Sequence, residues 1–342
     1  MIDCDLSLRV AAGGDPFTVR ADLTVADGET LVVLGPSGSG KSLLLEALAG
    51  VREGDGRVVV GDHDVTDRPP EDRGLGFVFQ EYALFPHRTV RENVAFGTRY
   101  HESTCDPAAV LDDLGIADLA DRSPDTLSGG EKQRVALARS LVVDPAAFLL
   151  DEPLAALDAP TRAELRGVLA DTLADETAIY VTHDRTTARA LGDRVAVLAD
   201  GQVRQVGSAT DVFERPRSPF VARFTGANCL SRERLPASLE ARLPAGEAVA
   251  IRPEHLRLVD GAAAGGSTAD GSTVDWPTVE GTVSRSIREE TTHRTTVDFG
   301  SQRLNVLTQE PPATGATVRV AIPEDRCHVV EGAADSAGQS SL

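Results

Sequence analysis

Positive charge is scarce in this sequence of 342 residues. Lys and Arg number 34 against 53 Asp and Glu, which gives a net charge of −19, and lysine occurs only at Lys41 and Lys132. Such a chain lacks the wide electropositive surface that binds DNA or anionic lipid, so we expect no nucleic-acid partner. Two explanations of the acidity remain open: a salt-rich cytoplasm, or a GC-rich genome that favours Arg, Ala, Gly and Asp codons.

Paired cysteines and long apolar runs are also missing. The four cysteines show no C-x-x-C pair and no spacing typical of metal ligands, which argues against structural disulfides; they are Cys4, Cys105, Cys229 and Cys327. The N-terminus has no basic flank followed by an apolar stretch, and no segment approaches about 18 consecutive apolar residues. We therefore expect a chain that is neither secreted nor membrane-spanning, so any membrane role comes through a partner.

Residues 1–226 alternate signals for strands and helices. The chain length fits about two domains of roughly 100–200 residues each. Apolar runs predict strands at 31–34, 57–60, 76–79, 148–150, 178–181 and 195–198, the last followed by a hairpin turn at Asp200-Gly201. Runs of helix formers predict helices at 43–49, 90–96, 108–114 and 131–141. The stretch from about 85 to 145 is therefore expected to be a mostly helical subdomain.

The pattern changes after residue 226. Helical periodicity disappears, and short alternating runs predict strands at 249–251, 282–284, 295–299, 303–307 and 317–322. These strands favour a small all-β domain, a barrel or a sandwich, over 227–342. The composition of 260–275 is that of a flexible loop, and the composition of 331–342 is that of a disordered tail.

A glycine-rich segment separates the strand at 31–34 from the helix at 43–49. This strand–loop–helix order is the context in which a P-loop binds phosphate, because backbone N–H groups and the positive end of the helix surround the phosphate oxygens. A lysine adds a point charge there, and a serine hydroxyl can ligate Mg²⁺. The segment predicts a nucleotide site on an α/β P-loop domain, formed by Gly35, Pro36, Ser37, Gly38, Ser39, Gly40, Lys41 and Ser42.

Two adjacent acids follow the apolar strand at 148–150. The carboxyl end of such a strand is where ligands meet an open α/β sheet. Asp151 is placed to hold Mg²⁺, and Glu152 is placed to orient and deprotonate an attacking water. By itself a strand that ends in Asp-Glu is more typical of a solvated turn.

The segment Leu127-Ser128-Gly129-Gly130-Glu131-Lys132-Gln133 decides between these readings. A Ser-Gly-Gly at a helix start offers a hydroxyl, free amides and a helix dipole to an anion. The segment resembles the signature of the ATP-binding cassette family, whose other motifs follow in order. They match Gln80 after a strand, Ala155-Ala156-Leu157-Asp158 after the acidic pair, and His183 at the end of a later strand.

The resemblance covers residues 1–226 and implies ATP hydrolysis by a head-to-tail homodimer of cassettes. Each ATP would lie between the P-loop of one cassette and the signature of the other. Ser128 and Gly130 would then bind the γ-phosphate of an ATP held by the partner's Lys41 and Ser42, and Gly129 between them would belong to the same nucleotide-binding segment.

The resemblance also assigns roles to the remaining motif residues. Gln80 would complete the Mg²⁺ shell with Ser42 and Asp151, and would sense the transport partner. Glu152 would polarise water, His183 would hold the γ-phosphate and Glu152, and Asp158 would connect the two sites.

One position departs from the family pattern. The family usually stacks an aromatic residue on adenine upstream of the P-loop, but residues 11–16 contain none. Phe17 is the nearest aromatic residue, either as the adenine contact or as a core residue of an early strand. The segment 82–87 resembles the family's groove for a helix of the membrane subunit.

A single cassette followed by a β domain resembles the ATPase subunit of importers. The segment Ala250-Ile251-Arg252-Pro253-Glu254-His255 is similar to their TOBE-like regulatory domain. Residues 40–50, with Glu46, and 76–87 look most like molybdate or tungstate importers. The implied partners are two integral-membrane permease subunits and, indirectly, an extracellular solute-binding protein. The implied location is the cytoplasmic face of the membrane.

Other readings remain open. The transported solute does not touch the catalytic site, so sulfate, thiosulfate or polyamine import are alternatives to molybdate. A non-transport cassette ATPase of DNA repair or translation would usually carry a long coiled-coil insertion or a second cassette, and neither is visible. In a further alternative, residues 227–342 act primarily as an oxyanion-binding regulator.

Overall fold

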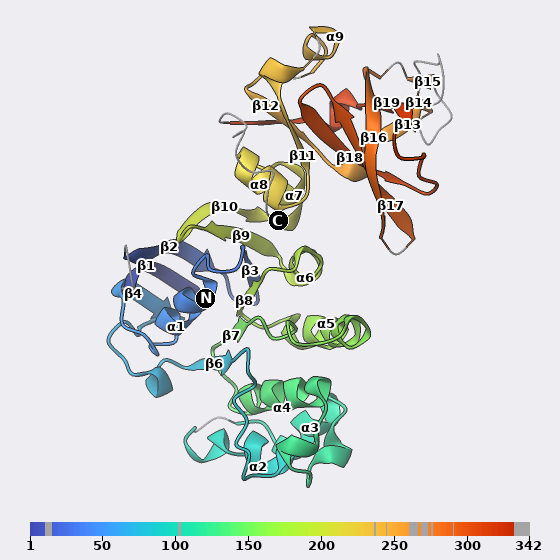
Figure 1. The fold of residues 1–342 in the computed structure, drawn as a ribbon. Helices are drawn as coiled ribbons and strands as arrows, with labels where there is room; N and C mark the ends of the chain where they lie inside the picture. The colour runs from blue at the N-terminus through green and yellow to red at the C-terminus, as the bar shows by residue number, and fades with distance from the viewer. Residues whose placement is uncertain are drawn as a thin grey trace. The chain divides into compact units, whose positions relative to one another are not determined.

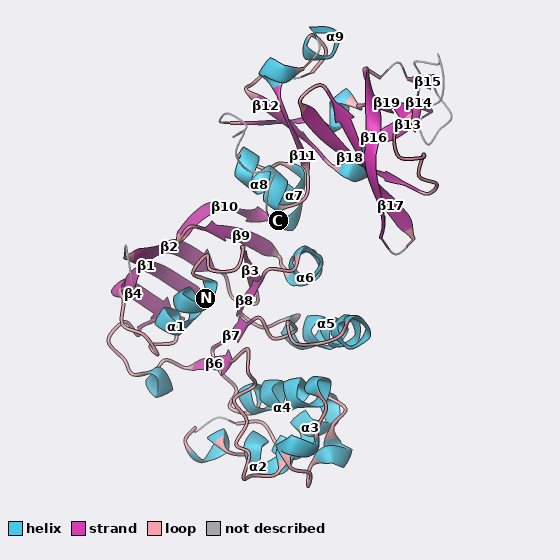
Figure 2. Ribbon diagram, in the orientation of Figure 1, coloured by secondary structure: helices cyan, strands magenta, loops and turns pink. Residues whose placement is uncertain are grey.

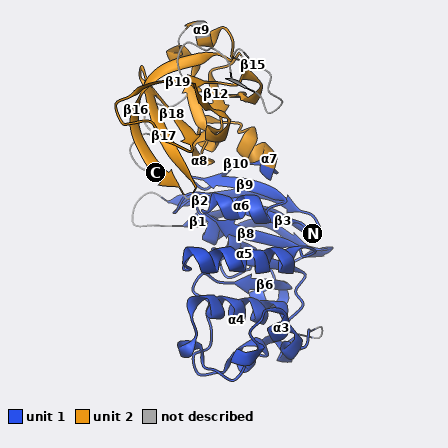
Figure 3. Ribbon diagram, turned by 90° about the vertical axis from the view of Figure 1, so that its right-hand side faces the viewer, with its two compact units in different colours: residues 1–209 blue, residues 210–342 orange. Residues whose placement is uncertain are grey.

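The computed structural model describes residues 1–10, 16–101, 104–235, 237–243, 245–259, 266–267, 273–274, 276–289 and 291–331. The chain divides into two compact units, Met1–Ala209 and Thr210–Leu342 (Figure 3). The division falls before the change in sequence character at residue 226, because helix α8 (Pro219–Phe224) packs against strands β11 (Asn228–Ser231) and β12 (Ala248–Ile251) of the second unit.

The first unit is built on a mixed β-sheet (Figures 1 and 2). Within the described residues its ten strands lie in the order β5-β4-β1-β2-β10-β9-β3-β8-β7-β6. Their bounds are β1 (Ile2–Val10), β2 (Phe17–Val25), β3 (Thr30–Leu34), β4 (Asp55–Val60), β5 (His63–Asp64), β6 (Leu75–Val78), β7 (Ala147–Asp151), β8 (Ala178–Thr182), β9 (Arg194–Ala199) and β10 (Gln202–Ser208).

The parallel part of this sheet runs β9-β3-β8-β7-β6. Every residue of β3, β7 and β8 is buried, which is why these strands read as unbroken apolar runs in the sequence. Helix α1 (Lys41–Leu48) packs Leu44, Leu45 and Leu48 into the same core cluster as strand residues Leu31 and Ile179. The carboxyl ends of the three buried strands are thereby held as one rigid edge.

The remaining helices of this unit are α2 (Val90–Val94), α3 (Pro107–Asp113), α4 (Gly129–Leu141), α5 (Ala159–Leu173) and α6 (Arg185–Leu191). Helix α6 packs against β3 and β8. Helices α2, α3 and α4 pack together, and α4 contacts β6, so this helical group lies beyond the β6 end of the sheet (Figures 1 and 2). All three lie within 85–145, the range for which the sequence predicts a helical subdomain.

The second unit is rich in β-structure. Its strands beyond β11 and β12 are β13 (Arg257–Val259), β14 (Gly266–Ser267), β15 (Thr273–Val274), β16 (Thr278–Glu289), β17 (Thr292–Phe299), β18 (Gln302–Thr308), β19 (Thr317–Ala321) and β20 (His328–Val330). Among the residues described there, β13-β19-β16-β17-β18 form one sheet and β11-β12-β20 another. Short helices α7 (Ala209–Glu214), α8 and α9 (Ala237–Glu240) accompany them. Val283, Val297 and Leu304 belong to its apolar core.

The predicted fold class, an α/β P-loop domain followed by an all-β domain, is confirmed by these two units. The hairpin predicted at Asp200-Gly201 joins β9 to β10, and both turn residues have positive φ, as such turns require. Strands β1, β5, β11, β13 and β20 and helices α5 to α9 match no predicted element, whereas β2 begins at Phe17, which one of its two readings places in an early strand. The loop predicted at 260–275 and the tail predicted at 331–342 lie mostly outside the described residues. In the part of the chain that is described, no helix has the length and hydrophobicity needed to span a bilayer.

Candidate functional site

The predicted phosphate loop connects the end of β3 to the start of α1. Gly38 has φ +78° and Gly40 has φ +100°, conformations that side chains rarely adopt. At Gly35 a Cβ atom would lie 2.3 Å from the carbonyl oxygen of Leu198, so only glycine fits beside β9. Three glycines of the motif are therefore required by the local geometry, and they leave the loop's backbone free to approach a ligand closely.

Lys41 is the buried cation of the loop, with 5% of its surface exposed. Its Nζ donates hydrogen bonds of 3.0 Å to the carbonyl oxygens of Gly35 and Pro36. The same Nζ lies 3.4 Å from Oε1 of Glu152, at the end of β7. The P-loop lysine and the predicted base are thus brought together from residues far apart in the sequence.

Ser42 and Asp151 form the second contact between the loop and β7. The Ser42 hydroxyl donates a 3.0 Å hydrogen bond to Oδ1 of Asp151. Burial raises the pKa of Asp151, the Ser42 hydrogen bond opposes that shift, and the Glu152 charge adds to it. A hydroxyl and a partly desolvated carboxylate are hard oxygen donors of the kind that Mg²⁺ prefers, so these two residues fit an Mg²⁺ that also binds nucleotide phosphate.

Glu152 also contacts the end of β8. Its Oε2 lies 2.7 Å from Nδ1 of His183, and its backbone N–H donates to the carbonyl of Val181. Its φ of +43° is unusual for a non-glycine residue and is held by this network. A small cavity borders Glu152 and His183. A carboxylate beside an imidazole can accept a proton from water and pass that proton to the imidazole nitrogen, while the neighbouring ammonium favours its ionised form.

Two further predicted residues lie at the margin of this cluster. Gln80 is exposed and follows the end of β6, the strand next to β7. The half-buried ring of Phe17 lies against the last glycine of the loop, because a Cβ on Gly40 would come within 3.1 Å of its Cε1. Phe17 also pairs with Val10 at the start of β2 and packs on the apolar core. The Phe17 side chain therefore packs on the apolar core, and the Cε1 edge of its ring borders the phosphate loop.

The signature residues begin helix α4. The Ser128 hydroxyl accepts from the backbone N–H of Glu131, and the Glu131 carboxylate accepts from the N–H of Ser128 at 2.6 Å, which forms a capping box. The latter bond lowers the pKa of Glu131. Ser128 and Gly129 are exposed. Since α4 lies beyond β6 while the P-loop follows β3, one chain does not bring its own signature to its own Lys41 (Figure 1).

Asp158 caps the start of α5, beside the signature. Its carboxylate accepts from the backbone N–H and the hydroxyl of Thr161, and these bonds lower its pKa. A Cβ on Gly130 would lie 2.7 Å from the Thr161 methyl group. Gly130 is thus the residue that lets α4 approach the first turn of α5.

Arg162 is a residue of the site that sequence reasoning missed. Its guanidinium donates to the carbonyls of Leu154 and Leu157, so it shapes the segment between Glu152 and Asp158. Both acceptors are backbone atoms, and an arginine near the start of a helix otherwise reads as an ordinary exposed charge. No signal in the sequence distinguishes it.

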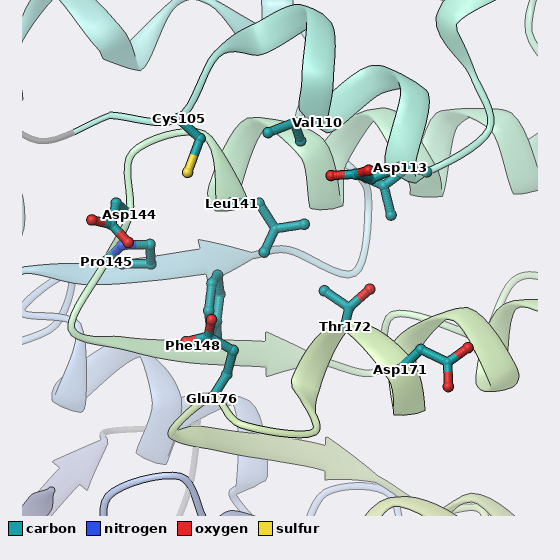
Figure 4. Close-up of a pocket in the computed structure, with 11 residues that line it drawn as sticks. Cys105, Val110, Asp113, Leu141, Asp144, Pro145, Phe148, Asp171, Thr172 and Glu176 are labelled. Carbon is teal, nitrogen blue, oxygen red and sulfur yellow. The ribbon is translucent and has the colours of Figure 1, made fainter.

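A separate cavity of about 360 Å³ lies at the opposite end of β7 (Figure 4). Phe148 and Leu141 contribute apolar surface, and four carboxylates line it: Asp113, Asp144, Asp171 and Glu176. Burial and nearby acids raise the pKa of Glu176. This lining repels phosphate, so the cavity is no competitor for the nucleotide.

Comparison with known proteins gives the same picture. Residues 19–155 match the ABC transporter family, and residues 249–330 match the TOBE domain. A sulfate/thiosulfate import ATP-binding protein of Mesorhizobium japonicum is 37% identical over 320 residues, which is 86% of this chain and 89% of that protein. A protein of the same description from Mycobacterium bovis is 48% identical over 217 residues, 61% of this chain and 62% of that one.

Two further matches extend the comparison. A putative 2-aminoethylphosphonate import ATP-binding protein of Salmonella typhimurium is 44% identical over 66% of this chain and 64% of its own length. The dimeric structure of an ATP-binding cassette in a post-hydrolysis state bound to ADP and Pi superposes with a TM-score of 0.56 at 29% identity, covering 61% of this chain and 99% of the cassette. This chain therefore belongs to the ABC transporter family, as an ATP-hydrolysing subunit with a TOBE domain.

Proposed function

We propose that this chain energises the uptake of sulfate or thiosulfate through a separate membrane permease. The proposed ATP hydrolysis is supported by five residues that lie together at one edge of the sheet: Lys41, Ser42, Asp151, Glu152 and His183. The relative of Mesorhizobium japonicum, matched through both domains, supports the choice of solute.

The P-loop residues Gly35 to Ser42 hold the phosphates of ATP. When ATP binds, the Lys41 ammonium donates to phosphate oxygens instead of to the carbonyls of Gly35 and Pro36. These charge-assisted hydrogen bonds offset the free-energy cost of burying the ammonium. Ser42, Asp151 and Gln80 would hold Mg²⁺, which would supply charge neutralisation at the phosphates. Phe17, whose ring borders Gly40, stacks on adenine.

Glu152 acts as the general base for the attacking water. It lies in contact with Lys41 and His183, so its orientation is set before substrate binds. His183 holds Glu152 through Nδ1 and presents its other ring nitrogen to the γ-phosphate. Neither role needs a covalent intermediate.

Two copies of the chain complete each site. The N-terminus of α4, where Ser128 and Gly129 are exposed and Gly130 is buried, offers the Ser128 hydroxyl and the Gly129 and Gly130 amides to an ATP bound by the other copy. Asp158, next to Gly130 through Thr161, links the two sites. The dimeric cassette bound to ADP and Pi supports this arrangement.

Coupling to the permease uses the segment that follows Gln80. Leu84 and Phe85 are half-buried apolar side chains between Gln80 and the exposed His87, and they suit a helix of the membrane subunit. Two permease subunits then hold the dimer at the cytoplasmic face of the membrane, with a solute-binding protein on the other side.

The relatives favour sulfate or thiosulfate as the transported solute, whereas the sequence motifs predicted molybdate or tungstate. That expectation rested on the segments at 40–50 and 76–87, which form parts of the P-loop helix and the β6 region rather than any contact with solute. The similar protein of Salmonella typhimurium is described as a putative import ATP-binding protein for a different solute, 2-aminoethylphosphonate.

Deletion of this chain in the cells that encode it tests the proposal. Uptake of radiolabelled sulfate and thiosulfate should fall to background and return with the intact chain, but not with Glu152→Gln. Molybdate uptake is the matched comparison and should be unchanged. Loss of molybdate uptake with normal sulfate uptake would overturn the proposed solute.

A further inference from the structure

The turn after Gln80 is strained. Tyr82 has φ +61° and Ala83 has φ +48°, so two consecutive non-glycine residues occupy the left-handed region. Such conformations persist where the surroundings impose them, and they concentrate at functional sites. This turn lies between Gln80 and Leu84, the two residues assigned above to the nucleotide and to the permease.

One side chain holds the strained turn. The Arg139 guanidinium donates hydrogen bonds of 2.6 Å to the carbonyl of Ala83 and 3.0 Å to the carbonyl of Tyr82. It also lies 5.6 Å from the centre of the Phe85 ring. The guanidinium donates to the two carbonyls through two different nitrogens, Nη1 and Nη2, in a fixed planar fork, whereas the ammonium of a lysine offers a single nitrogen. Arg139 belongs to the last turn of α4, the helix that begins with the signature.

A second contact links the same turn to the signature itself. A Cβ on Gly129 would lie 3.6 Å from the hydroxyl of Tyr82, so the Tyr82 side chain reaches the first residue of α4. Tyr82 is half-buried there, and burial raises the pKa of its phenol. The turn thus contacts α4 at both ends, through Tyr82 at Gly129 and through Arg139.

Phe85, in the segment assigned to the permease contact, is hydrogen-bonded to helix α2, which belongs to the same helical group as α4. Asn93 of α2 is fully buried; its Oδ1 accepts from the N–H of Phe85 and its Nδ2 donates to the Phe85 carbonyl. Helices α2 and α4 pack together. Phe85 is therefore fixed to α2, and through α2 to α4, so the segment that contains Phe85 is not a free loop.

We propose that Arg139 is a positioning residue that couples the permease-facing segment to the signature. This rests on the proposed transport function. When the permease moves Leu84 and Phe85, Arg139 and Tyr82 move α4 with them, and Ser128 shifts toward or away from the other copy's ATP. Helix α4 spans roughly 16 Å from Ser128 to Arg139 at 1.5 Å per residue and acts as a rigid connection.

The arrangement separates coupling from chemistry. Ser128 is held by its own capping box with Glu131, and Lys41, Asp151 and Glu152 lie on other elements. Loss of the Arg139 bonds should therefore spare the ATPase activity of the isolated chain and remove the response to the permease.

The test uses the complete transporter in proteoliposomes, with and without sulfate-loaded binding protein. For Arg139→Gln we expect basal ATP hydrolysis within about twofold of the intact protein and loss of the stimulation. Arg139→Lys, which keeps the charge but replaces the two donor nitrogens of the planar fork with one, should retain part of it. Arg134→Gln is the matched control, since Arg134 lies on the same helix and donates to the Leu114 carbonyl instead. Full stimulation of Arg139→Gln, or equal loss in Arg134→Gln, would overturn the proposal.

A second measurement does not depend on the solute. In full-length Glu152→Gln chains, ATP should slow amide hydrogen exchange at 128–131 and also at 82–85, because coupling between two sites is reciprocal. Adding Arg139→Gln should abolish the change at 82–85 and keep the change at 128–131. A change that persists at 82–85 would refute the role of Arg139. If neither segment responds to ATP in the Glu152→Gln chain, the shared nucleotide site is wrong, and the stimulation measurement alone decides the role of Arg139.

Discussion

Gly40 offers the sharpest test of how the phosphate loop is built. Its φ is +100°, and a Cβ there would lie 2.5 Å from Cγ2 of Val19 and 3.1 Å from Cε1 of Phe17. Gly38 has a similar φ of +78° but nothing within 4 Å of a Cβ. The two glycines therefore share the backbone requirement and differ in the space around them.

This difference gives separate magnitudes for Gly40→Ala and Gly38→Ala. Forcing alanine into the left-handed region costs about 1–2 kcal/mol at either position. At Gly40 the clash with Val19 and Phe17 adds about 1–3 kcal/mol of overpacking. We therefore expect Gly40→Ala to destabilise the first unit by roughly 2–5 kcal/mol, against about 1–2 kcal/mol for Gly38→Ala.

Thermal unfolding without nucleotide measures both effects, at roughly 2–4 °C per kcal/mol for a domain of this size. The Val19→Ala background supplies a control because it removes Cγ2, the atom nearest to the added methyl group. In that background Gly40→Ala should cost less than it does alone, while the cost of Gly38→Ala should not change. Equal losses at the two glycines, or strict additivity with Val19→Ala, would refute this reasoning.

Three further predictions concern charge. Burial raises the pKa of Asp151, so the ionised carboxylate destabilises the folded state at pH values above the ordinary pKa of the carboxyl group. Asp151→Asn should therefore raise the melting temperature at pH 7 while Mg²⁺-dependent ATP hydrolysis falls. A lower melting temperature would contradict this. Hydrogen bonds from Thr161 lower the pKa of Asp158 in the folded state. The stability that this ionised carboxylate contributes is present above the ordinary pKa of about 4 and is lost as the pH falls through the folded-state pKa. In Asp158→Asn, which still caps the helix, the melting temperature should lack this part of its pH dependence. Leu84→Asp should leave the ATPase activity of the isolated chain intact and weaken assembly with the permease at least about tenfold, as measured by co-purification, because an unpaired carboxylate in an interface is costly.

The elements that sequence analysis predicted best are those with one dominant signal. Strands β3, β7 and β8 are buried on both faces, so their sequences are continuous apolar runs. Strand β1 was missed although its buried residues alternate, at Ile2, Cys4, Leu6 and Leu8, because Asp, Ser and Arg stand between them. Half-buried strands carry a weaker signal per residue than buried ones.

Helix α5 was missed for a related reason. Over fifteen residues it buries only Leu165, Leu169 and Leu173, a stripe one residue wide at i, i+4 spacing. Helices with such a narrow apolar stripe show little contrast between their faces.

The candidate site was predictable as motifs but not as contacts. The order of β3, β8 and β7 in the sheet brings Lys41, Glu152 and His183 together, and that order is a tertiary property. Arg139 and Arg162 donate to backbone carbonyls, which every residue carries, so no side-chain pattern marks their partners. Contacts of this kind became visible only with the fold.

The role of Glu152 is the centre of this account, and Glu152→Gln measures it most directly. Glutamine keeps the shape and the contacts to Lys41 and His183 but cannot accept a proton. Loss of a general base should lower the ATP hydrolysis rate by roughly 10²–10⁴-fold, while ATP still binds and holds two copies of the chain together. The measurement is single-turnover hydrolysis alongside light scattering with ATP. Turnover within a fewfold of the intact protein would contradict the account.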